Sequence, residues 1–106
     1  NQENSTNSSS ALASFSRNEL NNDNKEITLK FLNASWIQLR DTNDKIILSK
    51  LMNEGDEFSY FIDDNFNLTA GNAGNIIVLL NNEVKGKAGK AGQVIDSLVI
   101  DNSFNN

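Results

Sequence analysis

The chain has 106 residues, enough for one folded domain. It contains no His and no Cys, which excludes Ser-His-Asp and Cys-His catalytic groups, zinc sites of the usual nitrogen and sulfur type, and disulfides. The net charge of −5 disfavours nucleic acid as a partner. No apolar run approaches the roughly 18 residues of a membrane-spanning helix. The chain starts at Asn, so we expect it to be an excised piece of a longer protein, and any membrane anchor or targeting segment would lie outside it.

The first part of the chain, residues 1–25, is dominated by Asn and Ser and has few apolar side chains. Such a segment cannot bury enough apolar surface to offset the conformational entropy that is lost on ordering. We therefore expect a disordered linker over residues 1–25 and a folded domain over residues 26–106.

Short apolar runs, separated by Asn, Asp and Gly about every ten residues, predict an all-β domain after the linker. In the first run, Ile27, Leu29 and Phe31 alternate with Thr28 and Lys30, so the three apolar residues share one face. We expect seven or eight strands, at residues 27–31, 35–40, 45–51, 57–62, 66–69, 76–80, 83–84 and 93–100.

Turn signals connect these strands. Residues 41–44 are Asp and Asn around one Thr, which predicts a hairpin. The run at residues 76–80 is apolar at every position, which indicates a central strand covered on both sides. It ends at Asn81-Asn82, a pair that tolerates the positive φ angles of a tight hairpin. The pattern predicts a small antiparallel β-sandwich of the immunoglobulin-like kind, or a partly closed barrel.

The densest acidic stretch contains Glu54, Asp56, Glu57, Asp63 and Asp64. A pair such as Glu54 and Asp64 would offer the two carboxylates that glycosidases use. These residues fall in turns on either side of a strand, and no apolar pocket that would raise a carboxyl pKa is evident. We interpret them as solvated turn residues and expect no catalytic residue in the chain.

Two stretches resemble binding motifs without matching them. Residues 63–67 offer oxygen ligands at the first, third and fifth positions of a calcium loop, but Leu68 and Gly74 stand where an EF-hand requires Gly and Glu. The glycine-rich stretch 85–92 lacks the Ser or Thr that follows Gly-Lys in a P-loop. We therefore expect neither a metal nor a cofactor.

Lysines and one Trp are the remaining candidate binding residues. Lys85, Lys87 and Lys90 form a basic cluster that could attract an acidic partner, although a flexible solvated loop over residues 85–92 is the simpler interpretation. Trp36 is the single Trp and begins a predicted strand. We expect it to fill the core because the domain has few large side chains; the alternative is an exposed anchor for a partner.

Several segments together resemble the C-terminal periplasmic domain of the RodZ family of bacterial cell-shape proteins. The match covers about residues 27–100 and rests on LKFLNASWIQLRD at residues 29–41, DKIIL at 44–48, NEGD at 53–56, LTAGNAGNI at 68–76 and LNN at 80–82. There are two departures from the family pattern. Asp63-Asp64-Asn65-Phe66 replaces the usual proline-containing segment, and Asn82 stands where the hairpin often has Gly.

The resemblance implies a non-enzymatic β domain that a low-complexity linker joins to a single membrane helix. It further implies a cytoplasmic helix-turn-helix domain that contacts the actin-like protein MreB, and periplasmic partners in the cell-wall elongation machinery, with peptidoglycan as a further candidate. Two alternatives are a carbohydrate-binding module and a glycan hydrolase that uses carboxylates.

The glycine and asparagine residues of the matching segments are candidate structural determinants, as is Trp36. We expect Gly55, Gly71 and Gly74 to adopt backbone conformations that are closed to residues with a Cβ. We expect Asn72 to form a hydrogen bond within its own turn. The edges of the predicted sheets are candidate partner sites, because an edge strand can accept an added strand.

Overall fold

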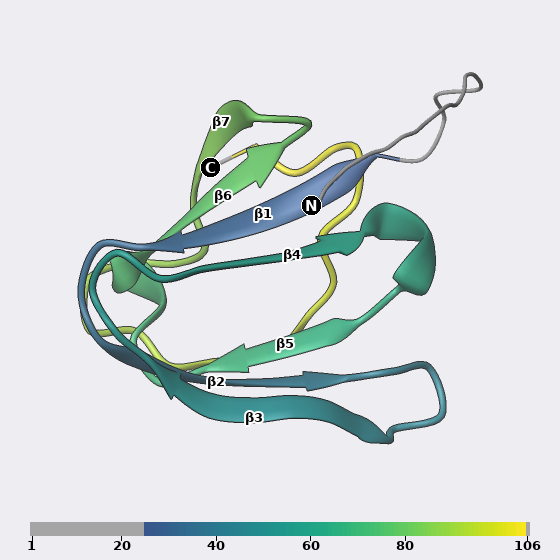
Figure 1. Ribbon diagram of the computed structural model, residues 1–106, viewed down its shortest axis with the longest axis horizontal. Coiled ribbons are helices and arrows are strands. Elements are labelled where there is room, and N and C mark those ends of the chain that lie inside the picture. Colours follow the sequence, from purple (N-terminus) through teal and green to yellow (C-terminus); the bar gives the residue numbers. More distant parts are fainter. Residues whose placement is uncertain (1–24, 106) are drawn as a thin grey trace, which may run out of the picture.

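A computed structural model describes residues 25–105 and arranges them in two four-stranded antiparallel sheets that pack face to face (Figure 1). Sheet A has the strand order β4-β1-β6-β7, and sheet B has the order β3-β2-β5-β8. The strands are β1 (Glu26–Phe31), β2 (Ser35–Arg40), β3 (Ile46–Met52), β4 (Glu57–Phe61), β5 (Asn67–Ala70), β6 (Ile76–Leu80), β7 (Glu83–Lys87) and β8 (Ile95–Leu98). Two short 3-10 turns, η2 (Ile62–Asp64) and η3 (Ala73–Asn75), join β4 to β5 and β5 to β6.

The predicted all-β sandwich is confirmed, and the barrel alternative is wrong because the strands of residues 25–105 form two separate sheets. Of the linker expected over residues 1–25, residues 1–24 lie outside the described residues. The carbonyl of Lys25, at the end of that expected linker, accepts a hydrogen bond from the Ile62 N–H at 2.9 Å. Within the described range, no helix has the length and apolar character needed to cross a bilayer.

The core forms between the two sheets because their central strands alternate in hydrophobicity. On β1, Ile27, Leu29 and Phe31 are buried together, which confirms that they share one face. On β2, Ile37 and Leu39 are completely buried and belong to the same core cluster. The connection from β1 to β2 passes from one sheet to the other, so consecutive segments of the chain supply opposite walls of the core.

Strand β6 lies between β1 and β7, as expected for a central strand. Its inward residues are buried, and Leu79 on the outward side is buried as well, while Ile77 is half-buried. The strand ends in a two-residue turn in which Asn81 has φ 49° and Asn82 has φ 68°. These two positive values fit a type I′ hairpin, which confirms the predicted turn.

The hairpin between β2 and β3 is also confirmed. The Asp41 carboxylate accepts hydrogen bonds from the backbone N–H groups of Asn43, at 2.8 Å, and Lys45, at 2.9 Å. Asp44 takes a positive φ of 66°, a conformation that Asp tolerates better than most residues. The local turn chemistry therefore fixes the pairing of β2 with β3, and with it the face of the sheet to which each side chain points.

Candidate functional site

Trp36 lies on the outer face of sheet B, where its side chain is 40% exposed. The expectation that it fills the core is wrong. Side chains alternate along β2, so Ser35, Ile37 and Leu39 point inward while Trp36 and Gln38 point outward. The position of Trp36 could have been inferred from the sequence, because it shares its side of the strand with polar residues.

Trp36 belongs to a row of residues that crosses the outer face of sheet B. Leu51 on β3 pairs with Trp36 across the two strands and is 55% exposed. On the other side, the Gly71 N–H donates a hydrogen bond to the Trp36 carbonyl at 2.9 Å, and Gly71 has no side chain to cover the indole. Beyond Gly71, Val94 precedes β8 and is 68% exposed. We call the row of Leu51, Trp36, Gly71 and Val94 the Trp36 surface.

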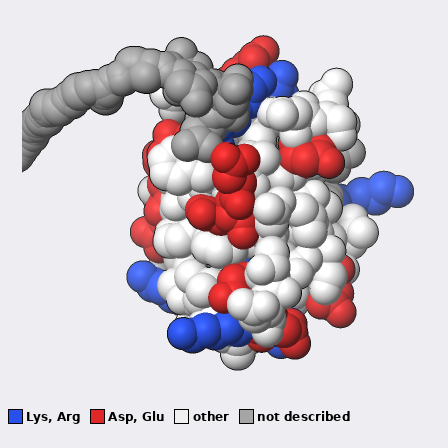
Figure 2. All heavy atoms as spheres, turned by 90° about the vertical axis from the view of Figure 1, so that its right-hand side faces the viewer, with Lys and Arg blue, Asp and Glu red and all other residues white. Residues whose placement is uncertain are grey.

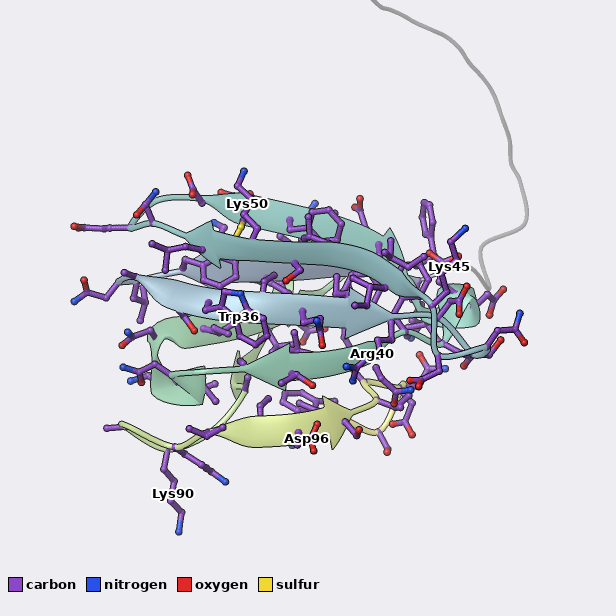
Figure 3. All side chains as sticks on the ribbon, turned by 90° about the horizontal axis from the view of Figure 1, so that it is seen from below. Trp36, Arg40, Lys45, Lys50, Lys90 and Asp96 are labelled. Atoms are coloured by element: carbon purple, nitrogen blue, oxygen red, sulfur yellow. The ribbon has the colours of Figure 1, made fainter. Side chains whose placement is uncertain are left out.

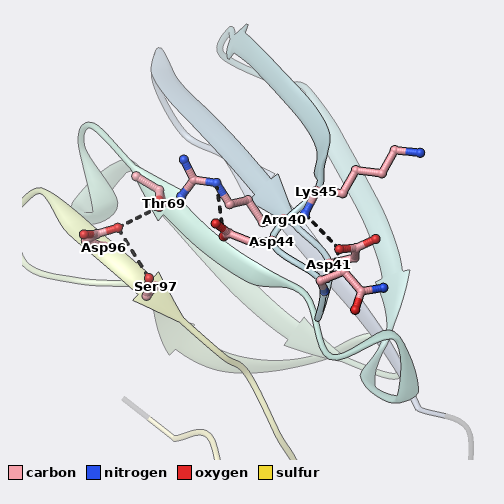
Figure 4. A network of polar contacts seen from close by, with 8 residues as sticks. Arg40, Asp41, Asp44, Lys45, Thr69, Asp96 and Ser97 are labelled. Atoms are coloured by element: carbon pink, nitrogen blue, oxygen red, sulfur yellow. Dashed lines mark hydrogen bonds and ion pairs between the residues drawn. The ribbon is translucent and has the colours of Figure 1, made fainter.

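A polar row lies next to the Trp36 surface on the same face of sheet B. Gln38 is paired with Ser49 on β3 and with Thr69 on β5. The Thr69 hydroxyl donates a hydrogen bond to an oxygen of Asp96 at 3.1 Å, and the Ser97 hydroxyl lies 3.5 Å from the same oxygen (Figure 4). An aromatic group and hydrogen-bonding groups therefore lie side by side on one open surface.

The far end of this face is charged. Figure 3 looks onto sheet B and shows Trp36 and Arg40 on β2, with Asp96 on β8. The Nε atom of Arg40 lies 3.6 Å from an oxygen of Asp44, which is in the turn that follows β2 (Figure 4). An exposed ion pair of this kind contributes about 0 to 1 kcal/mol to stability.

The three lysines of the basic cluster do not join the Trp36 surface. Lys85 and Lys87 belong to β7 in sheet A, so the expectation of a flexible loop beginning at residue 85 is wrong for these two residues. The Lys85 ammonium lies 3.4 Å from a Glu83 carboxylate oxygen. Lys90 lies in the loop after β7, and its backbone N–H donates to the side-chain oxygen of Gln93 at 2.8 Å.

The glycines have different roles from those expected. Gly55 has φ +87°, a conformation that L-residues rarely adopt, as predicted. The same expectation is wrong for Gly71 and Gly74, neither of which has a positive φ. Gly74 is required instead for close approach, because a Cβ there would lie 2.6 Å from the Ala91 Cα and 2.7 Å from the Lys90 carbonyl oxygen.

Asn72 forms the expected hydrogen bond within its own turn through its backbone, because its carbonyl accepts from the Asn75 N–H at 3.1 Å, while its side chain connects two distant segments. Its side-chain oxygen accepts a hydrogen bond from the Gly92 N–H at 3.2 Å. Its own N–H donates to the Ser35 hydroxyl, also at 3.2 Å, and the neighbouring Ala73 N–H donates to the Gln93 carbonyl at 2.8 Å. The glycine-asparagine segment is therefore the place where the loop after β7 is attached to sheet B.

The structure does not bring Glu54 and Asp64 together. They lie beyond opposite ends of β4, whose five residues alone span about 17 Å at about 3.4 Å per residue. A glycosidase pair lies within about 10 Å. The Asp64 carboxylate accepts a hydrogen bond from the Phe61 N–H at 3.0 Å, and Asp56 accepts one from the Asn53 N–H at 2.8 Å.

Acidic side chains are spread over the end of the sandwich that carries η2, which is seen face-on in Figure 2. In residues 25–105 no three acidic side chains lie close enough together to hold a metal ion. The acidic residues therefore contribute to turns and to surface charge.

Among the described residues, Tyr60 is a buried titratable group whose surroundings shift its pKa. Its side chain is on β4 in the core, its ring centre lies 5.4 Å from that of Phe66, and its hydroxyl has no hydrogen-bond partner among the described residues. Burial raises the pKa of the Tyr60 hydroxyl, and the negative charge of Asp64 adds to this effect. Because Tyr60 is buried, it offers no platform to a ligand.

Comparison with known proteins gives one match. A family model described as the RodZ C-terminal domain matches residues 28–97. No curated protein and no solved structure matches the chain. The matched residues extend from β1 into β8, so they contain the Trp36 surface and the glycine-asparagine segment. The resemblance found in the sequence is thereby confirmed, and the chain belongs to the family of RodZ C-terminal domains.

Proposed function

We propose that this domain is a non-enzymatic interaction module of a single-pass inner-membrane protein that links the MreB cytoskeleton to peptidoglycan synthesis and maintains rod shape. Membership of the RodZ C-terminal domain family supports a RodZ-like role in cell shape. In this proposal the domain lies in the periplasm, attached by an anchor outside these 106 residues. Its partners are proteins of the cell-wall elongation machinery.

The exposed pair of Trp36 and Leu51 is the observation that carries the proposal. A Trp side chain buries up to about 250 Å² in a core or an interface. Covering the exposed 40% of Trp36 would thus remove about 100 Å² from water, which corresponds to about 2.5 kcal/mol. This value is typical of an interface hot spot, a class in which Trp is enriched.

The outer face of sheet A is less suited to a partner. There the hydroxyls of Thr28 and Ser59 are 2.9 Å apart and hydrogen-bonded, and Lys30 lies 3.9 Å from Glu57. The exposed apolar residues of that sheet lie on its two opposite edge strands, Phe61 on β4 and Val84 on β7. Sheet B alone combines a central exposed aromatic residue with an adjacent exposed aliphatic one.

Photo-crosslinking in living cells that carry the whole protein tests the proposal. A photoreactive residue is placed at Leu51 and, as the matched control, at Val84, which is an exposed aliphatic residue of the other sheet. We expect crosslinks to elongation proteins from position 51 and not from position 84. Equal crosslinking from both positions, or none from position 51, contradicts the proposal.

A shape assay provides a second test of the same proposal. Cells that produce Trp36→Ser or Leu51→Ser protein at normal levels should lose their rod shape. Both side chains are exposed, so the substitutions leave the core intact. Unchanged rods in both strains would contradict a role for the Trp36 surface.

A carbohydrate-binding module is the second candidate function, and the polar row beside Trp36 favours it. An indole face can stack on the apolar face of a sugar ring while Gln38 and Thr69 form hydrogen bonds with hydroxyl groups. Cosedimentation with purified cell-wall sacculi tests this function. Binding that is lost in Trp36→Ser supports it, and binding that is unchanged in this variant excludes the Trp36 surface as the sugar site.

The non-enzymatic part of the proposal has its own test. Purified protein should release no fragments from peptidoglycan. If fragments appear, and Glu54→Gln or Asp64→Asn abolishes their release, the proposal is wrong on this point.

A further inference from the structure

Three of the four sheet edges in residues 25–105 carry features that discourage pairing with another chain. Strand β8 has only four residues, and one of them, Ser97, has φ 63°. Strand β7 contains a register shift and Gly86 with φ 130°. Strand β4 carries Glu57 and leads directly into the acidic η2 turn. Short length, bulges and charge are the usual means of protecting an edge.

Strand β3 is the exception in length and regularity, and the one protective feature that it carries is the charge of Lys50. Its seven residues make it the longest strand of the described part of the chain, and β2 is its one partner there. The register shift affects only the first residues of β3, so Leu48–Met52 pairs regularly with Ser35–Leu39. Ile46, Ile47 and Leu51 are exposed apolar residues on this strand. The regular part of the edge is about 17 Å long, enough to accept a short added strand.

The edge of β3 is positively charged in an otherwise acidic chain. Lys45 and Lys50 form no ion pair with any residue that the structure describes, and no acidic residue occurs between Lys45 and Met52. Lys50 pairs with the fully buried Ile37, so its Cβ is on the core side of the sheet and its ammonium group lies at the exposed rim. The chain as a whole has a net charge of −5.

We propose that the free edge of β3 binds an extended acidic segment of a partner protein as an added strand of sheet B. This proposal rests on the interaction function proposed above and names the chemistry of the partner. Backbone hydrogen bonds to β3 supply affinity, and alternate side chains supply selectivity. An apolar side chain of the partner packs beside Leu51 and extends the Trp36 surface, while the next residue places a carboxylate opposite Lys50.

A second copy of this chain fits the edge less well. Antiparallel pairing of β3 with its own copy about Ser49 or Leu51 brings the two Lys50 side chains to diagonal positions, and pairing about Lys50 places them directly opposite each other. Like charges at such positions are destabilising. The charge of Lys50 therefore disfavours self-association and favours a carboxylate in the added strand.

Titration calorimetry and NMR with a synthetic peptide test the proposal. The probe is an acetylated and amidated pentapeptide of threonine, valine, glutamate, valine and threonine; in the control peptide lysine replaces glutamate. We expect the acidic peptide to shift the β3 amide signals and to slow hydrogen exchange at alternate amides of β3, those that do not already bond to β2. Lys50→Glu should weaken binding of the acidic peptide at least fivefold and strengthen binding of the lysine peptide.

Lys90→Glu is the matched control because it makes the same charge change on the exposed loop after β7, away from β3 (Figure 3). Lys90→Glu should change the affinity for the acidic peptide and for the lysine peptide less than twofold. The proposal is overturned if the acidic peptide binds wild-type and Lys50→Glu protein equally, if its effects map to β7 or β8, or if no binding is found at millimolar peptide.

A tetramer of N-acetylglucosamine serves as the competing probe. If it shifts the Trp36 signals while the acidic peptide has no effect on β3, strand addition is wrong and the sugar-binding function is favoured. If cellular crosslinks from Leu51 persist while the peptide fails to bind, strand addition is wrong and the interaction function still stands.

Discussion

Replacing Tyr60 with Phe removes the single phenol group of the chain from the core. The hydroxyl is buried, has no hydrogen-bond partner among the described residues, and has a raised pKa. The substitution leaves the ring and its packing against Phe58 and Phe66 in place. It therefore isolates the contribution of one hydroxyl to the free energy of unfolding and to the pH dependence of that free energy.

The sign of the pH effect follows from whether Tyr60 holds its proton in the folded chain and in the unfolded chain. Below the ordinary Tyr pKa of 10.0, Tyr60 keeps its proton in both the folded and the unfolded chain. In that range Tyr60 therefore adds no pH dependence to the free energy of unfolding. Above that pH, the unfolded chain loses the proton while the buried hydroxyl of the folded chain retains it, so stability falls as pH rises. At a pH about one unit above the pKa of Tyr60 in the unfolded chain, the free energy of unfolding is lower by about 1.4 kcal/mol.

Urea unfolding of the wild-type and Tyr60→Phe proteins at pH 8 and pH 11, followed by circular dichroism, measures this contribution. All other side chains are the same in the two proteins, so their contributions cancel in the difference. We expect Tyr60→Phe to be as stable as wild type at pH 8, or more stable by about 1 kcal/mol because a buried unpaired hydroxyl is removed. At pH 11 its advantage should grow by about 1.4 kcal/mol.

Two results would refute this reasoning. One is a stability difference between the proteins that stays constant from pH 8 to pH 11. The other is phenolate absorbance near 295 nm that rises in the folded wild-type protein with a midpoint near the ordinary Tyr pKa of 10.0, since this would mean that the hydroxyl is accessible and not held protonated.

Substitutions at four positions test local features of the fold by urea unfolding. Gly74→Ala should lower the free energy of unfolding by about 1 to 3 kcal/mol, because the added Cβ would lie 2.6 Å from the Ala91 Cα. In Gly71→Ala the nearest atom would lie 3.8 Å from the added Cβ, so the free energy of unfolding should change by less than about 0.5 kcal/mol. Equal effects of the two substitutions would contradict the close-approach argument. Asp41→Ala removes two hydrogen bonds to the hairpin backbone and should cost about 1 to 2 kcal/mol, and no loss would mean that water replaces them fully. Asn82→Ala should cost about 1 kcal/mol at φ 68°, while Asn82→Gly should be tolerated; the reverse order contradicts the turn assignment.

Short-range features of the fold could be predicted from the sequence because each depends on neighbouring residues. Alternation in residues 27–31 places three apolar side chains on one face, and the structure buries all three. Asn81 and Asn82 favour positive φ, and both have it. The departure from the family pattern at Asn82 is physically small, since Asn and Gly both tolerate that conformation.

The candidate site was predicted less well because its residues depend on contacts between distant segments. Trp36 was expected in the core on the ground of size, although it shares its side of β2 with Gln38. Gly74 was expected to need a special backbone angle, but its constraint comes from Ala91, 17 positions away. The exposed edge of β3 follows only from the strand order.

The amino-acid sequence by itself determined the all-β class, the hairpin turns and the RodZ resemblance, because these depend on residue type and local spacing. The tertiary structure decided that Leu51 lies beside Trp36 and that β3 ends sheet B. The physical reason is that a strand can bury either of its faces and can pair on either side. Only the packing of two sheets around one core selects which apolar residues are covered and which, like Leu51, stay exposed to solvent.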